Sequence, residues 1–139
     1  MELKPIGIIH SPYQDQDNTP RQGFYSEEPV TLEIYPEYTE GLRGIDELTQ
    51  IVVLYWGDRS DRNILLANPP HSMETVGVFV SRSPARPNPI LMNIAHILRI
   101  EGSKVIVKGM DALDGSPLLD IKPHISPLKP KTQAKKYDH

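Results

Sequence analysis

Proline occurs 14 times in this chain and is spread along most of its length. A proline inside a helix removes a backbone hydrogen bond and clashes with the preceding turn, so this distribution disfavours long helices. Short runs rich in Val, Ile, Leu and Tyr lie between the prolines and are bounded by Gly, Pro or Asp, which is typical of strands. We expect seven strands, at residues 3–10, 30–35, 50–56, 76–81, 93–101, 104–110 and 118–121.

Three local patterns refine this expectation. Two strands meet at Glu101-Gly102-Ser103, which predicts a hairpin with glycine in its turn. The run IVVLYW (51–56) is apolar throughout and predicts a central strand covered on both faces. Residues 37–48 carry Leu and Ile at helical spacing, but two glycines in that stretch limit the expected helix to one or two turns.

Many short strands separated by turn signals predict an all-β fold, namely a small single-domain β-barrel with one or two short helical turns. A chain of 139 residues has the length of one ordinary domain. We assign residues 1–126 to the barrel and residues 127–139 to a basic C-terminal tail. Leu128 is the only aliphatic anchor in that tail, so we expect it to be mobile or ordered only by a partner.

Several classes of function are disfavoured by what the chain lacks. There is no cysteine, which excludes disulfides, thiolate zinc sites and a cysteine nucleophile. There is no glycine-rich dinucleotide fingerprint, P-loop, G-x-S-x-G or H-E-x-x-H motif, and the five histidines show no close metal-ligand spacing, so no metal is expected. We see no secretory signal and no apolar run long enough for a membrane helix, so we expect a cytoplasmic protein without a membrane partner.

The net charge of −3 hides an uneven distribution. Residues 1–49 hold 10 acidic and 3 basic side chains, whereas residues 50–139 hold 8 acidic and 12 basic ones. The second part of the chain is therefore suited to an anionic partner such as RNA. An asymmetry of this size is also common on solvated surfaces, and the charges alone do not decide between these interpretations.

Two polar segments stand out as candidates for a functional site. In SRSPARPNPI (81–90), prolines surround Arg82 and Arg86, and a stiff loop with two guanidinium groups suits a carboxylate or phosphate. In DALDGSPLLDIKP (111–123), Asp-Gly followed by Ser-Pro predicts a turn whose backbone groups can read a purine edge or a ribose. The alternative in each case is an ordinary surface turn with ion pairs.

Aromatic residues near these segments extend the candidate site. Tyr13, Tyr55 and Trp56 could supply aromatic faces for an adenine or a sulfonium, although such residues are more often part of a core.

Taken together, the segments closely resemble the TsaA-like family, and the match runs from residue 4 to about 126. Its best-known members use S-adenosylmethionine to methylate the exocyclic amine of threonylcarbamoyladenosine, next to the tRNA anticodon. The resemblance implies a small barrel that forms a homodimer, with the cofactor near the dimer interface and tRNA as a partner. The matching motifs are IGIIHSPY (6–13), PRQ (20–22), the stretch from GLRGID to VVLYW (41–56), GVFVSRSPARPNPI (77–90) and DALDGSPLLDIKPHI (111–125).

Residue roles follow from the resemblance by position. The acceptor amine must also lose a proton, for which Asp58 or Asp114 is a candidate base unless the proton leaves to water. Arg86, Asn88, Asp120 and Lys122 match further motif positions and are assigned to substrate or to holding the loops. The implied cofactor contacts are Pro20, Arg21, Gln22, Asp58, Arg59, Arg82, Met92, Asp111, Ala112, Leu113 and Asp114.

The chain departs from the family pattern at a few positions. Asp58 stands where a histidine is usual, His124 where a tyrosine is usual, and NPILMN replaces NPIGLS, so that Leu91 replaces a glycine and Asn93 a serine. These changes bear on the substrate more than on the fold. A second hypothesis therefore stays open: an S-adenosylmethionine-binding protein that acts on a small molecule or protein, or that has no tRNA methylation activity.

Overall fold

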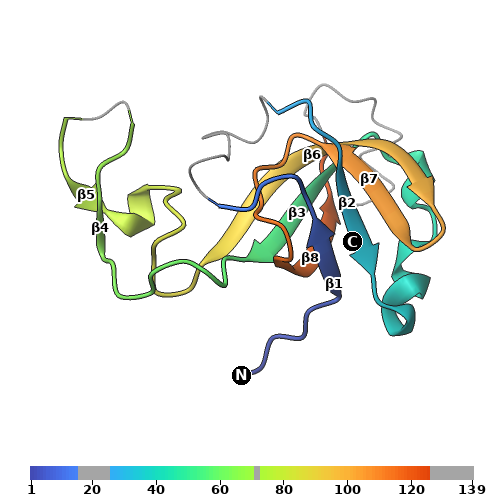
Figure 1. The fold of residues 1–139 in the computed structure, drawn as a ribbon, viewed down its shortest axis with the longest axis horizontal. Coiled ribbons are helices and arrows are strands. Elements are labelled where there is room, and N and C mark those ends of the chain that lie inside the picture. The colour runs from blue at the N-terminus through green and yellow to red at the C-terminus, as the bar shows by residue number, and fades with distance from the viewer. Residues whose placement is uncertain (16–25, 71–72, 126–139) are drawn as a thin grey trace.

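The computed structural model describes residues 1–15, 26–70 and 73–125. Six antiparallel strands close into a barrel in the spatial order β1, β2, β7, β6, β3, β8 (Figure 1). The predicted all-β barrel is confirmed, and closure leaves none of these six strands as a free edge. The strands are β1 (Gly7–His10), β2 (Val30–Ile34), β3 (Gln50–Trp56), β6 (Ile90–Glu101), β7 (Lys104–Lys108) and β8 (Pro117–Pro123).

The core lies inside the barrel and is built from alternate residues of each strand. In β3, burial alternates along the strand, with Ile51, Val53 and Tyr55 pointing inward. The prediction that this strand is covered on both faces is wrong, because Val52 and Leu54 lie on the outer face and are only partly buried. A barrel has one interior, so an apolar run in its wall leaves every second side chain outside.

The hairpin between β6 and β7 is confirmed. Glu101 pairs with Lys104, and Gly102 in the turn has a φ of 62°. That left-handed conformation is open to glycine at little cost.

The helical stretch after β2 forms 3-10 turns, η3 (Pro36–Leu42) and η4 (Ile45–Glu47). Gly44, with a φ of 89°, separates them, and Ile45 is their one fully buried residue. A longer amphipathic helix would need an apolar face packed against the core, and this stretch buries too little apolar surface to stabilise one.

The predicted strand 76–81 is wrong. Only β5 (Val76–Gly77) is extended, paired with β4 (Leu66–Ala67), and the next residues form the 3-10 turn η5 (Val78–Val80). The Arg86 guanidinium donates to the carbonyls of Val78, Ser81 and Ser83, which a strand would use in its ladder.

Strands β4 and β5 belong to an arm that stands away from the barrel (Figure 1). We call residues 60–89 the arm. Five large apolar side chains among its described residues are more than half exposed: Leu65, Leu66, Met73, Phe79 and Val80. Exposed apolar side chains in such a group mark a surface that is suited to a partner.

Candidate functional site

The predicted turn at 111–116 connects β7 to β8 at the end of the barrel where β1 ends. Met110 and Ala112 are fully buried and anchor it in the core. Gly109 and Gly115 have positive φ angles, 96° and 84°, which let the chain leave β7 and enter β8 sharply. The turn is therefore anchored in the core, while Asp111 and Asp114 are only partly buried.

The segment after β1 binds one side of this turn. The Ser11 amide donates to Asp114 Oδ1 at 2.9 Å, and the Ser11 hydroxyl donates to the Ala112 carbonyl at 2.7 Å. The Asp114 amide in turn donates to the Tyr13 carbonyl at 2.7 Å. The Asp114 carboxylate thus holds the turn against the end of β1.

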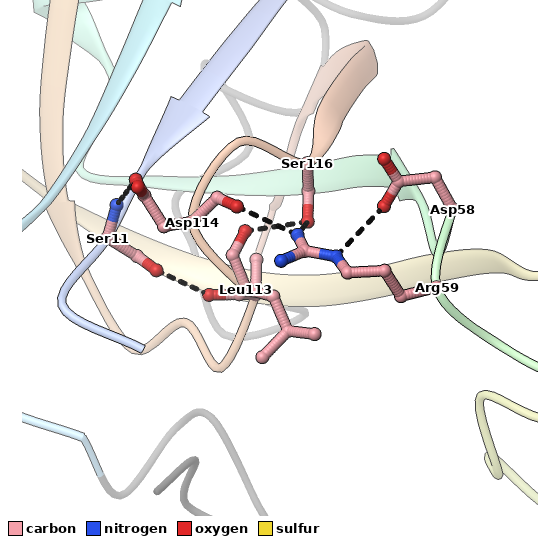
Figure 2. Close-up of polar contacts among 7 residues, drawn as sticks. Ser11, Asp58, Arg59, Leu113, Asp114 and Ser116 are labelled. Atoms are coloured by element: carbon pink, nitrogen blue, oxygen red, sulfur yellow. Dashed lines mark hydrogen bonds and ion pairs between the residues drawn. The ribbon is translucent and has the colours of Figure 1, made fainter. Parts of the chain in front are cut away.

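Arg59, just after β3, binds the other side (Figure 2). Its Nη2 donates to the Asp114 carbonyl at 2.8 Å and lies 3.4 Å from Ser116 Oγ, while its Nε lies 3.3 Å from Asp58 Oδ1. The structure therefore brings Asp58, Arg59 and Asp114 together, as the resemblance implied. The guanidinium of Arg59 thus joins the carboxylate of Asp58 to the backbone of the turn, while the Asp114 carboxylate faces Ser11.

Asp111 is held from the barrel wall. The Tyr55 hydroxyl donates to Asp111 Oδ1 at 2.9 Å, and the Asp111 amide donates to Asn93 Oδ1 at 3.3 Å. Burial of the Tyr55 ring, followed by the negative charge of Asp111, raises the pKa of the Tyr55 hydroxyl well above its ordinary value. Tyr55 therefore remains a hydrogen-bond donor throughout the physiological pH range.

The raised pKa of Tyr55 predicts a loss of stability in alkali. Above about pH 10, tyrosine ionises in the unfolded chain but stays protonated in the fold, so the free energy of unfolding falls as the pH rises. Urea unfolding between pH 8 and 11 should show this fall in the wild type and a smaller one in Tyr55→Phe. Equal slopes in the two proteins would contradict it.

Part of the turn keeps hydrogen-bonding capacity. Within the described residues, the amides of Ala112 and Leu113 and the carbonyl of Asp111 make no hydrogen bond. A donor and an acceptor on adjacent backbone units match the pairing pattern of a purine edge. The residues present thus fit the adenine and the charged groups of S-adenosylmethionine.

The loop 81–90 is braced by its own arginine. Among the described residues, Arg86 donates to the carbonyls of Ser81 and Ser83 within the loop and to the carbonyl of Val78 in η5. Asn88 Oδ1 and the Pro87 carbonyl accept from Arg62, whose guanidinium carbon lies 5.2 Å from the centre of the Trp56 ring. These contacts favour the loop-holding role for Arg86 and Asn88.

Other predicted site residues lie away from the turn. Arg82 follows η5 on the arm and is exposed, with no side-chain hydrogen bond in the described part of the chain. Met92 and Asp120 both lie opposite Leu54, on the outer face of the barrel, and Lys122 pairs with Asp120 at 3.1 Å. Pro20, Arg21 and Gln22, like the tail 127–139, lie outside the described residues.

Three residues that hold the turn were not predicted. Ser11 and Ser116 each precede a proline, and this Ser-Pro pair is a local turn signal that could have marked them. Asn93 was noted only as a departure. Tyr13 and Tyr55, considered as aromatic faces, are buried, and Tyr13 bonds Ser26 through its hydroxyl at 2.6 Å.

A cleft of about 580 Å³ lies at the other end of the barrel, where β1 begins and β2 ends. Its walls are the 3-10 turns and the second half of β8, including Asp120 and Lys122. In residues 1–15, 26–70 and 73–125, no three His, Asp or Glu side chains converge as a metal site would require. No helix in those ranges has the length and apolar character needed to cross a bilayer.

The closed barrel places the chain in a structural class that includes solved methyltransferase structures. The crystal structure of TrmO from Pseudomonas aeruginosa superposes with a TM-score of 0.75 at 28% identity, over 90% of this chain and 56% of that one. The chain belongs to the family of the tRNA-methyltransferase O N-terminal domain, whose model matches residues 8–128. The resemblance inferred from the motifs is confirmed.

Two relatives from Archaeoglobus fulgidus differ in length. An S-adenosyl-L-methionine-binding protein is 47% identical over 88% of this chain and 88% of its own length. A probable S-adenosyl-L-methionine-binding protein is 45% identical over 97% of this chain but only 37% of its own length. The chain thus spans about a third of one relative and little more than half of the solved TrmO chains.

Proposed function

We propose that this chain is an S-adenosylmethionine-dependent methyltransferase whose acceptor is the exocyclic amine of threonylcarbamoyladenosine in tRNA. The observation that carries the proposal is the turn 111–114, which is fixed from three sides yet leaves backbone donors and an acceptor unpaired. Family membership and the names of the relatives support the same cofactor and reaction.

The turn is the part of the site suited to the cofactor. The Asp111 carbonyl and the Leu113 amide, which lie on adjacent peptide units, would pair with the adenine edge. The carboxylate of Asp58 would lie near the positively charged groups of the cofactor. When bound, S-adenosylmethionine supplies a methyl group on an electrophilic sulfonium. The protein would hold the methyl group and the acceptor nitrogen in line, and this positioning can lower the barrier to methyl transfer by several kcal/mol.

The carboxylates of Asp58 and Asp114 differ in the hydrogen bonds that they already make. Asp114 Oδ1 accepts the Ser11 amide, so this carboxylate is committed to holding the turn. Within the described part of the chain, the Asp58 carboxylate contacts the Arg59 guanidinium alone, at 3.3 Å, and its side chain is partly exposed. Of the two, Asp58 is therefore the better placed to take the proton that the acceptor amine loses.

Two measurements test the proposal. Calorimetry should detect the binding of S-adenosylmethionine and of its demethylated product to the purified protein. The protein should then transfer a labelled methyl group to tRNA that carries threonylcarbamoyladenosine, and not to tRNA that lacks it. The absence of binding to either cofactor form would refute the proposal.

The alternative is cofactor binding with another acceptor or with no tRNA methylation. It is favoured by the relative of matching length, which is named only for binding S-adenosyl-L-methionine. Tight binding without transfer to tRNA would select this alternative.

We propose further that the protein works as a cytoplasmic homodimer. The apolar side chains exposed on the arm, of which Phe79 is 81% and Val80 76% exposed, are suited to contact with a second copy. Sedimentation velocity should show a dimer for the wild type and a shift toward monomer for Phe79→Ser. A monomeric wild type would refute the dimer.

A further inference from the structure

Asn93 is an amide in an apolar row of β6. It lies opposite Val53 of β3, which is fully buried, and side chains directly opposite on adjacent strands share one face of the sheet. An amide on the inner face of a barrel is costly to bury unless its polar atoms are hydrogen-bonded. Asn93 is only partly buried, and its Oδ1 accepts the backbone amide of Asp111 at 3.3 Å.

The register of β6 and β7 explains this contact. His96 pairs with Lys108, so a continued antiparallel ladder would place Asp111 opposite Asn93. The pairing ends at Lys108, because the positive φ of Gly109 turns the chain away from β6. Beyond that point the backbone of β6 no longer pairs with the Asp111 amide, and the Asn93 side chain accepts it instead.

Asp111 is held at a second point by Tyr55. The Tyr55 hydroxyl bonds the Asp111 carboxylate, whereas Asn93 bonds the Asp111 amide. Both side chains come from neighbouring strands of the barrel wall, β3 and β6. The wall therefore holds the peptide unit before Asp111 and the Asp111 side chain, which are the two groups next to the unpaired Asp111 carbonyl.

We propose that Asn93 is a positioning residue, which acts through the Asp111 amide to aim the unpaired groups of the turn at the methyl donor. This inference rests on the proposed function. Asn93 does not need to touch the ligand, because its effect passes through the backbone of the turn.

Asn93→Leu keeps the branched shape of the side chain and suits the apolar row, but removes the acceptor. We expect its melting temperature to stay close to that of the wild type. Exchange of the Asp111 amide, followed by NMR, should become about tenfold faster, and the affinity for S-adenosylmethionine should fall about tenfold by calorimetry. Asn93→Ala should show the same changes in amide exchange and affinity. It replaces the leucine variant in this test if that variant does not fold.

Two further variants separate the contacts. Tyr55→Phe should weaken binding while the Asp111 amide stays protected. Asn68→Leu replaces an exposed amide of the arm that accepts from Thr75, and should leave both readouts unchanged.

The outcomes distinguish this inference from the proposed function. A wild type that binds no cofactor refutes the proposed function. A wild type that binds, with Asn93→Leu binding equally well, refutes the inference alone. Weaker binding with unchanged exchange of the Asp111 amide also refutes it, because the effect would then not pass through that amide.

Discussion

Gly7→Ala should destabilise the barrel by about 3 kcal/mol. A Cβ at Gly7 would lie 2.1 Å from the Glu33 carbonyl oxygen and 3.2 Å from the Ile34 Cα, and both atoms belong to the backbone of β2. Gly7 is the first residue of β1 and pairs with both Ile34 of β2 and Leu118 of β8, so its backbone cannot move away from β2 without disturbing these pairings. Urea unfolding, with the midpoint and slope fitted separately, measures the loss.

The matched control is Gly41→Ala in η3. No atom lies within 4 Å of a Cβ at that position, and its φ is not positive. The control should stay within about 1 kcal/mol of the wild type. If Gly7→Ala lost no more unfolding free energy than Gly41→Ala, the close approach of the β1 and β2 backbones at Gly7 would be contradicted.

Asp114→Ala should lower the affinity for S-adenosylmethionine by about thirtyfold, which corresponds to about 2 kcal/mol. The substitution leaves the Ser11 amide without its acceptor and frees the turn from the end of β1. Calorimetry gives the affinity, and thermal unfolding shows how much of the protein stays folded at the temperature of the titration.

Asp114→Asn separates geometry from charge. An asparagine keeps an oxygen that can accept the Ser11 amide, so the turn should hold and most of the affinity should return. A loss in Asp114→Asn as large as in Asp114→Ala would mean that the charge of Asp114, and not its hold on Ser11, matters for the ligand. Wild-type affinity in Asp114→Ala would remove the turn from the proposed site.

The strands of the barrel could be predicted because their signal is local. β3 was predicted with its observed bounds, and the hairpin turn at Gly102 followed from the glycine alone. The segment 76–81 could not be predicted, because its shape depends on hydrogen bonds from Arg86, which lies beyond it in the chain. The periodicity of an apolar run carries no information about such a contact.

The site shows the same division between local and distant signals. The turn at 111–116 was predicted from Asp-Gly and Ser-Pro, which act over a few residues. The partner of Asp111 was not, because Tyr55 lies 56 positions away and its apolar surroundings indicated a core residue. Asn93 was noted only as a departure from the family pattern. Its hydrogen bond to the Asp111 amide could not be predicted, because it depends on where the β6–β7 ladder ends.

The hydrogen bond between the Ser11 amide and Asp114 joins residues 103 positions apart, and β1 pairs directly with β8. During synthesis, the first strand therefore waits for nearly all of the barrel to be made before its last neighbour is available. Contacts of such long separation slow folding, because the chain loses much freedom before they form. The proposed ligand site is thus among the last parts of the molecule to form during synthesis, because a nascent chain without β8 has no closed barrel to hold the turn 111–114.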